Sequence, residues 1–343
     1  MVVFLFAINA SIFQNKIRKI NIKIAPYINR NVVSSGHAEF IANEMFHKYA
    51  QEKVDILKEG VAPPSVAVLD YVLKCMEYNK FLKNATFEFV SISLPDYQIV
   101  HRQNWEKEKN LLRQKYDLCG DMPCPEVFYF HHGLRFASKR IRDYVRHKDI
   151  IDCGAFIGDS FLVLREYTDK VVYCYEFSRK NVEKFSKVMK TNSVASGYRL
   201  IPMALGEDVH RIRYHEPDAA TSGMVLIEGR GNDLADMTTI VAEVEKYGAK
   251  VGFIKMDVEG YGLPVIKGAI NTIKSQRPVL SLGVYHNHDE LFRIKPLLQK
   301  HLKNYVYEFH LQAFDDGDFN EMILFCYPKE VEDAGQNSMF RRH

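Results

Sequence analysis

Two segments in the middle of the chain hold the residues whose types and spacing could bind a ligand. The first, 150–160, reads Ile-Ile-Asp-Cys-Gly-Ala-Phe-Ile-Gly-Asp-Ser, an apolar strand that runs into a glycine turn. Its last two residues are both good N-caps for a following helix. Gly154 and Gly158 lack the side chains that would keep a ligand away from the backbone. Their spacing differs from the Gly-x-Gly-x-x-Gly of dinucleotide sites, so the turn predicts a ligand without a pyrophosphate.

The second segment is the apolar run 171–176, which ends in Glu176. This acid follows the glycine turn by roughly 20 residues, where a carboxylate accepts hydrogen bonds from both hydroxyls of a ribose. The two segments together predict a site for a nucleoside-containing cofactor.

Candidate proton acceptors follow two later strands. Asp257 and Glu259 come at the end of one, and His286 at the end of the next. Histidine changes charge near neutral pH, which makes His286 the best single base; Asp257 is the alternative, either as the base or as the group that orients the histidine. A divalent metal held by Asp257 with His286, His288 or Asp289 is a further alternative that we do not favour. A purely structural cluster also remains open, and Lys255 fits best as the structural partner of an acid.

The positions of these residues depend on alternating strands and helices. Short β-rich runs alternate with helical segments from residue 149 onward, which predicts a parallel sheet with helices on both faces. A turn around 315–318 joins two final strands into a hairpin. The expected strands are 150–153, 171–176, 199–204, 252–257, 279–285, 305–311 and 321–327, and the expected helices are 160–167, 181–191, 239–247 and 263–275.

The preceding part, residues 1–120, is expected to be mainly helical. Apolar residues recur at helical spacing over 38–59, helices are expected over 65–80 and 101–116, and 87–94 alternates like a strand. The apolar start, 1–13, has no basic flank and is too short to span a bilayer, so it is expected to be a buried strand. The tail 331–343 is polar. We therefore divide the chain into 1–120, 121–330 and 331–343.

The balance of charged residues limits the classes of binding partner that we expect. Lys and Arg number 46 against 43 Asp and Glu, a net charge of +3 with no long basic run. We therefore expect no nucleic-acid and no membrane partner. The six cysteines show no zinc spacing, which favours a reducing, cytoplasmic setting. A homo-oligomer remains open.

Five motifs in the same order resemble the FkbM family of methyltransferases, over about 128–328. They are 152–160, Tyr175-Glu176-Phe177, 254–260 (Ile-Lys-Met-Asp-Val-Glu-Gly), Lys267-Gly268-Ala269 and Tyr285-His286. The resemblance implies the class I methyltransferase fold, a Rossmann-like, mostly parallel seven-stranded sheet that ends in an antiparallel hairpin. It also implies S-adenosylmethionine as cofactor and a hydroxyl of a sugar, glycan or related small molecule as methyl acceptor.

The resemblance assigns roles to residues of this chain. Asp152, Gly154 and Gly158 would line the methionine end of the cofactor, Glu176 would bind the ribose, and Phe177 would lie against the adenine. The full set expected at the cofactor is Asp152, Gly154, Ala155, Phe156, Gly158, Asp159, Ser160, Glu176, Phe177, Ala204 and Asp257, with Leu205 and Gly206 also bordering the base, and the catalytic set is His286, Asp257 and Glu259.

Two departures from the family pattern bear on activity. Members continue Glu-Gly-x-Glu after the aspartate, whereas this chain has Gly262 in place of the second acid. Members also carry Leu-Asp after a pair of threonines, where this chain has Ile240-Val241. An alternative function is therefore a non-catalytic, cofactor-binding module that recruits a partner through its N-terminal region.

Overall fold

The computed structural model describes residues 50–83, 95–221, 231–314 and 320–331. The predicted strands 1–13 and 87–94, the first part of the helix over 38–59 and the turn at 315–318 lie outside this range. The helices that precede the sheet are α3 (Ala50–Lys58), α4 (Pro63–Lys83), α5 (Asp96–Lys115), α6 (Pro125–Phe128) and α7 (Lys139–Arg146), with a short 3₁₀ turn η2 (His131–Gly133).

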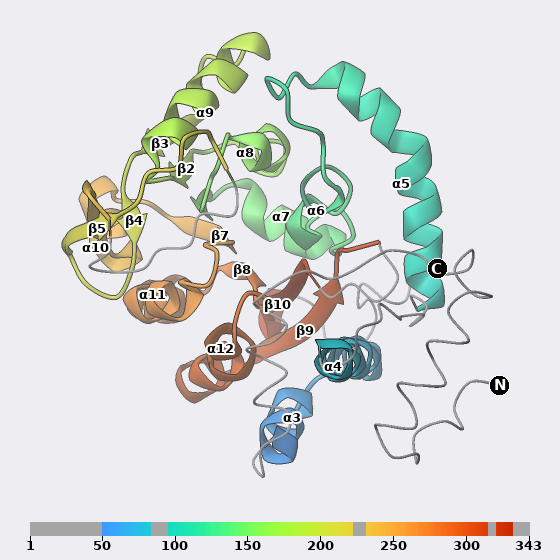
Figure 1. The fold of residues 1–343 in the computed structure, drawn as a ribbon. Coiled ribbons are helices and arrows are strands. Elements are labelled where there is room, and N and C mark those ends of the chain that lie inside the picture. The colour runs from blue at the N-terminus through green and yellow to red at the C-terminus, as the bar shows by residue number, and fades with distance from the viewer. Residues whose placement is uncertain (1–49, 84–94, 222–230, 315–319, 332–343) are drawn as a thin grey trace.

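A seven-stranded sheet in the order β3-β2-β1-β7-β8-β10-β9 forms the centre of the molecule (Figure 1). Only β10 runs antiparallel to its neighbours. This is the predicted class I methyltransferase arrangement, with its closing hairpin. The strands are β1 (Asp149–Cys153), β2 (Val172–Tyr175), β3 (Tyr198–Ile201), β7 (Val251–Met256), β8 (Val279–Gly283), β9 (Tyr305–Leu311) and β10 (Met322–Pro328).

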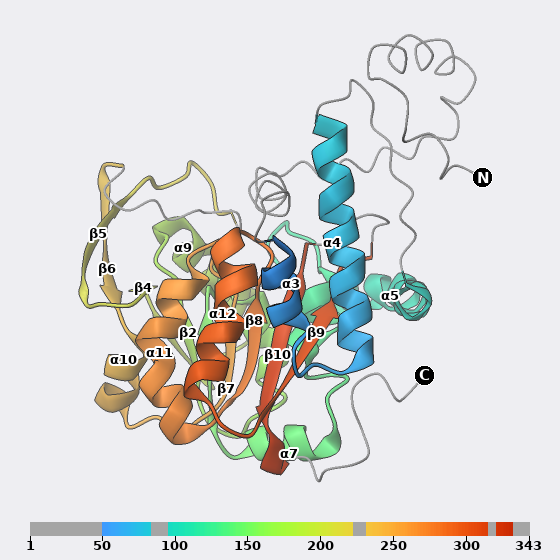
Figure 2. The same cartoon turned by 90° about the horizontal axis from the view of Figure 1, so that it is seen from below.

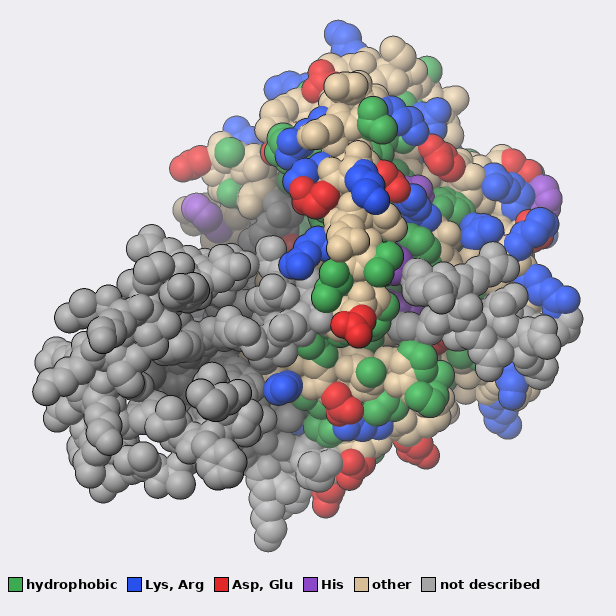
Figure 3. Space-filling model, turned by 90° about the vertical axis from the view of Figure 1, so that its right-hand side faces the viewer, with side chains coloured by type: hydrophobic (Ala, Val, Ile, Leu, Met, Phe, Trp, Pro, Cys, Tyr) green, Lys and Arg blue, Asp and Glu red, His purple; other side chains and the backbone are tan. Residues whose placement is uncertain are grey.

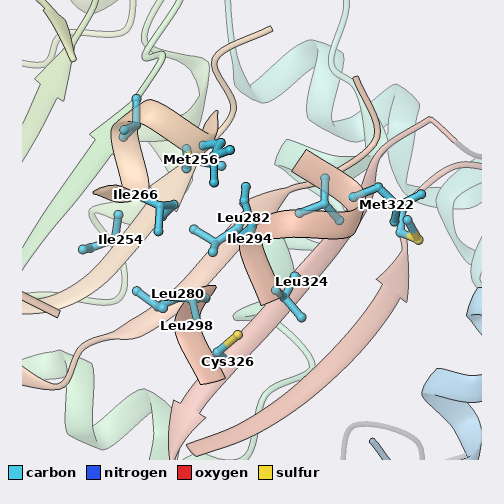
Figure 4. Packing of buried hydrophobic residues seen from close by; sticks show 14 of the residues in the cluster. Ile254, Met256, Ile266, Leu280, Leu282, Ile294, Leu298, Met322, Leu324 and Cys326 are labelled. Carbon is cyan, nitrogen blue, oxygen red and sulfur yellow. The ribbon is translucent and has the colours of Figure 1, made fainter. Parts of the chain in front are cut away.

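Helices cover both faces of this sheet because successive side chains of a strand point to opposite sides. On one face, α10 (Ile240–Tyr247), α11 (Gly262–Gln276), α12 (His288–His301), α3 and α4 pack in a row (Figure 2). On the other face lie α5, α6, α7, α8 (Asp159–Leu164) and α9 (Arg179–Thr191). Figure 4 shows the first core, where residues of β7, β8 and β10, such as Ile254, Leu282 and Leu324, meet Ile266 of α11 and Ile294 and Leu298 of α12.

The N-terminal helices also contact the sheet edge. Ser65 of α4 accepts a hydrogen bond at Oγ from the backbone N–H of Phe309 in the edge strand β9 (2.9 Å), and the Gln98 amide of α5 donates to the carbonyl of Leu311. Lys295 of α12 donates to two carbonyls near the end of α3. These contacts pair backbone groups that an edge strand and a helix end would otherwise leave open.

Three expectations about elements were wrong. The third strand ends at Ile201 because Pro202 has no N–H for the ladder. Ala204 belongs instead to β4 (Ala204–Leu205), part of an unpredicted three-stranded sheet with β5 (His210–Tyr214) and β6 (Asp233–Thr238). The helix expected over 160–167 ends at Leu164, where bonds of the tighter 3₁₀ type take over.

Helix α12 was not predicted, although the sequence carried its signal. Asn287 is the N-cap and accepts from the backbone N–H of Glu290, the acid three positions later. This spacing is that of a capping box.

The described surface matches the balanced composition. On the face shown in Figure 3, basic and acidic side chains are interspersed rather than gathered into a patch of one sign. None of the helices over the described residues combines the length and apolar character that a bilayer crossing needs.

Candidate functional site

A cavity of about 480 Å³ lies at the carboxyl edge of the parallel strands. Its walls come from the segments that follow β1, β2, β7 and β8, from β4, from α6 and from the residue before β10. This is the edge at which open α/β sheets bind their ligands, and the volume falls within the roughly 300–1,000 Å³ of small-molecule pockets.

Most of the residues expected at the cofactor line this cavity. Those that do are Gly154, Phe156, Asp159, Ser160, Glu176, Phe177, Ala204 and Asp257, together with Leu205; those that do not are Asp152, Ala155, Gly158 and Gly206.

The glycines of the turn are required by packing. Gly154 and Gly158 have φ of 78° and 83°, in the left-handed region that favours glycine. A Cβ on Gly154 would lie 1.9 Å from the carbonyl oxygen of Asp257, and one on Gly158 would lie 2.8 Å from the ring of Phe185. A side chain at either position would therefore clash with protein, and of the two glycines only Gly154 lines the cavity.

Asp152 lies in the core beneath the turn and does not line the cavity. It is fully buried in β1, and its Oδ1 lies 3.1 Å from Nζ of Lys255, its neighbour in β7. Burial raises the pKa of the Asp152 carboxyl, and the nearby ammonium opposes that shift. Lys255 also donates to the carbonyl of Gly154 (2.7 Å). The pair thus fixes the turn, and the predicted structural role of Lys255 agrees with this geometry.

Glu176 bridges the two predicted ligand segments. Its Oε2 accepts from the backbone N–H of Phe156 (3.1 Å) and its Oε1 from that of Ser178 (2.8 Å). Burial raises the pKa of this carboxyl to about 7, although these hydrogen bonds act in the opposite direction. A carboxylate has about four acceptor positions, so capacity remains for hydroxyl groups of a ligand.

The wall beside Glu176 is apolar and aromatic. Phe177 packs edge-on against Tyr214 with ring centroids 5.1 Å apart, and Met203, Ala204 and Leu205 continue the same wall. We call this part of the cavity, with Glu176, the nucleoside end. A flat apolar slot beside a buried acceptor suits a ring carried on a ribose.

Carboxylates gather in another part of the cavity, which we call the acidic end. Asp257, Glu259, Tyr285, Glu126 and Glu321 line it. The Tyr285 hydroxyl donates to Glu321 (2.8 Å) and lies 3.4 Å from Oδ1 of Asp257. Burial and the charge of Asp257 raise the pKa of Glu259 to about 7. Burial, then repulsion from Glu126 and Asp257, raises the pKa of Glu321 well above its usual value.

His286 lies behind this wall and does not line the cavity. It is 1% exposed, with Nε2 3.3 Å from Asp257 Oδ1 and 3.6 Å from Glu259 Oε2. Burial alone would lower its pKa, but the bond to Glu290 and the charges of Asp257 and Glu259 raise it to about 9. At neutral pH His286 is therefore an imidazolium without a free electron pair. His286 therefore does not reach the cavity directly, and Asp257, which does, is the candidate base that the geometry favours.

The alternative metal cluster is only partly assembled. Ligand-type atoms of Asp257, Glu259 and His286 lie within 4.8 Å of one another. His288 instead contacts Lys53 (2.8 Å), and Asp289 pairs with Arg293.

Among the cavity residues that sequence reasoning missed are Glu126, Glu321 and His132. Glu126 and Glu321 reach the cavity from α6 and from the turn before β10, and burial together with repulsion from Asp159 and Asp257 raises the pKa of Glu126 to about 7. His132 contacts the Ser160 hydroxyl (2.9 Å) from η2. Each is a lone polar residue outside the recognised motifs, and only the positive φ of His132 and Glu321 sets them apart locally.

The structure also shows where the two departures from the family pattern lie, Gly262 and Ile240-Val241. A Cβ on Gly262 would lie 2.7 Å from Oε1 of Glu290, so a carboxylate from α12 already occupies the space beside this position. Ile240 is fully buried in the core, and neither it nor Val241 lines the cavity.

The comparisons with known proteins agree with this architecture. The Methyltransferase FkbM domain family matches residues 152–330. The crystal structure of Methyltransferase FkbM from Methylobacillus flagellatus is similar at TM-score 0.55 and 19% identity over 84% of this chain, which spans 60% of that protein's length. Identity at this level shows a shared fold alone.

Two further solved structures are more distant. The human methyltransferase 10 domain containing protein has TM-score 0.40 and 11% identity, covering 67% of this chain and 97% of its own. The O-methyltransferase TomG from Streptomyces achromogenes has TM-score 0.37 and 10% identity, covering 73% and 95%. We draw nothing from these two. No curated protein matches the sequence.

Proposed function

This chain belongs to the FkbM methyltransferase family, and we propose that it transfers the methyl group of S-adenosylmethionine to a hydroxyl of a sugar, glycan or related metabolite. In this proposal residues 121–330 form the catalytic domain. One observation carries it: a single cavity has a buried carboxylate beside an apolar slot at one end and Asp257, held by an imidazolium, at the other.

The residues of the nucleoside end fit the cofactor. Glu176 would accept from the ribose hydroxyls, and Phe177 and Ala204 would border the adenine. Asp159, 8% exposed at the start of α8, would face the ammonium group of the methionine part. When bound, S-adenosylmethionine supplies a methyl group already activated on a sulfonium. The protein must then orient the acceptor hydroxyl and remove its proton.

Asp257 is the base in this proposal. It lines the cavity, whereas His286 does not. The Asp257 carboxylate would take the proton of the acceptor hydroxyl, whose oxygen would receive the methyl group that the cofactor supplies. The His286 ring, with Nε2 3.3 Å from Oδ1 of Asp257 and 3.6 Å from Oε2 of Glu259, would balance part of the charge of these two carboxylates.

The rest of the acidic end would bind the acceptor. Glu126, Glu321 and Tyr285 offer hydrogen-bonding groups around Asp257, and carboxyl groups with raised pKa values both donate and accept near neutral pH. A hydroxyl-rich molecule matches such a wall, which supports a sugar or glycan.

The test is transfer of a labelled methyl group to a panel of mono- and oligosaccharides and small hydroxylated metabolites. We expect label in an acid-stable ether on at least one acceptor, lost in Asp257→Asn. Binding of S-adenosylmethionine without transfer to any panel member would support the non-catalytic alternative instead.

A chelator added to the same assay separates the two forms of proton removal. We expect turnover to continue with chelator present, because in this proposal the Asp257 carboxylate takes the proton without help from a metal. Activity lost with chelator and restored by magnesium or manganese would favour metal assistance instead.

A further inference from the structure

Glu290 is a buried acid in the first turn of α12, outside the cavity and outside the recognised motifs. It is 1% exposed, and both of its oxygens are in use. Oε2 accepts from Nδ1 (2.9 Å) and from the backbone N–H (3.3 Å) of His286, and Oε1 accepts from the backbone N–H of Gly262 (2.9 Å). The side chain therefore links α12 to the start of α11 and to the histidine behind the acidic end.

We propose that Glu290 is the positioning residue of the proton-accepting group: it holds the His286 ring through Nδ1 so that Nε2 faces Asp257 and Glu259. This inference rests on the proposed function, because it gives Glu290 a role in keeping Asp257 ready to accept a proton.

The geometry of the ring supports this role. With its Nδ1 proton held by Glu290, a neutral imidazole would turn the Nε2 electron pair toward two carboxylates, at 3.3 and 3.6 Å. That arrangement is repulsive, whereas a second proton on Nε2 makes it attractive. The groups that face His286 are Asp257 and Glu259 after β7, Glu290 in α12 and the stacked ring of Tyr285, 3.9 Å away. Three of these four are acids.

The surroundings of Glu290 are shaped to admit it. The Cβ of any residue other than glycine at 262 would lie 2.7 Å from Oε1, so Gly262 leaves room for this carboxylate. Asn287 accepts from the backbone N–H of Glu290 and donates to the carbonyl of Gly260, which ties the first turn of α12 to the loop that carries Glu259. An acid thus reaches the space next to position 262 from another helix.

A plain capping role is the competing explanation, and charge separates the two. A glutamine at 290 would still accept from the Gly262 N–H, but it would not stabilise a positive charge on His286. An opposite charge at this distance shifts a pKa by about 1–3 pH units.

The experiment is an NMR titration of the His286 imidazole in the full chain, with the signal assigned from the spectrum of His286→Gln. We expect the wild-type ring to titrate near pH 9 and the Glu290→Gln ring at least about one pH unit lower. Glu308→Gln is the matched control, because Glu308 is also a buried glutamate bonded to a histidine, His310 (3.1 Å), in β9. It should leave the His286 titration unchanged.

Two results would overturn the inference: a wild-type His286 that titrates at or below its usual pH, or a Glu290→Gln ring that titrates with the wild type. If Glu290→Gln does not fold, Glu290→Asp takes its place, since it moves the charge away by one carbon. In Glu290→Asp the His286 ring should titrate at a lower pH than in the wild type. An unchanged titration pH would also contradict the inference. None of these readings needs an acceptor, so a failure here is distinct from a failure to bind or transfer, which calorimetry and the label assay report.

Discussion

At the nucleoside end, the oxygens of Glu176 are each held by a backbone N–H, whereas at the acidic end Asp257 and Glu259 face each other and a charged imidazole. The first arrangement is set by the turn and strand that form it. The second is a balance of charges, and it changes whenever one member gains or loses a proton. This difference suits a cofactor that binds in one way and an acceptor whose proton must be removed.

Asp257→Asn should show the largest difference between the two ends of the cavity, with a loss of turnover and little change in cofactor affinity. An amide cannot take the acceptor proton, so turnover should fall by about 10²–10⁴-fold. Cofactor affinity should change little, because Glu176 and its hydrogen bonds are untouched. Turnover and calorimetry on the same preparation measure both effects, and an unaltered rate would place the base elsewhere, with Glu259 the next candidate.

Glu176→Ala should have the opposite effect, weakening cofactor binding while leaving turnover nearly unchanged. Loss of a charged hydrogen bond costs about 1.5–3 kcal/mol, which corresponds to a cofactor affinity roughly tenfold or more weaker. Turnover at saturating cofactor should remain close to wild type. Calorimetry and a melting curve check the prediction; unchanged affinity in a folded variant would make Glu176 a structural acid only.

His286→Gln sharpens the account of the acidic end. Without the imidazolium, the Asp257 carboxylate loses the positive charge that faces it, and the pKa of Glu259, which that charge lowers, should rise. We expect turnover about tenfold lower at pH 7 and partial recovery as the pH increases. Wild type should instead lose activity above about pH 9, where His286 gives up its proton. A variant slowed equally at all pH values would contradict this charge balance.

The smallest expected effect is the pH dependence of cofactor binding. Burial raises the pKa of Glu176 to about 7, so the acid is largely protonated below that pH and ionised above it. An ionised carboxylate is the stronger acceptor for ribose hydroxyls, and affinity should therefore rise as the pH increases through 7, by up to about tenfold. Titration calorimetry from pH 6 to 8 measures this trend, and Glu176→Gln should remove it.

The same two ends differ in how far the sequence predicted them. The nucleoside end comes from contiguous segments around 150–160 and 171–177, so local patterns and the resemblance were enough to locate Phe156, Glu176 and Phe177 at one cavity. Even there, burial of Asp152 against Lys255 was not visible, because strand register decides it.

The acidic end is assembled from α6, the loops after β7 and β8 and the turn before β10. Neither Glu126 nor Glu321 has a local signal that points to the cavity. The charge of His286 depends on Glu290, which belongs to a helix that we did not predict. The ordinary pKa of histidine favoured His286 as the base. The structure favours Asp257 instead, because Asp257 lines the cavity and His286 is buried behind it.

The most direct test of the central claim is calorimetric titration of the full chain with S-adenosylmethionine, with its demethylated product and with a nicotinamide dinucleotide. The account predicts binding of the first two in the micromolar range, about −7 to −8 kcal/mol, and no binding of the third. Heat with the dinucleotide and none with either sulfur-containing ligand would contradict the assignment of the cavity.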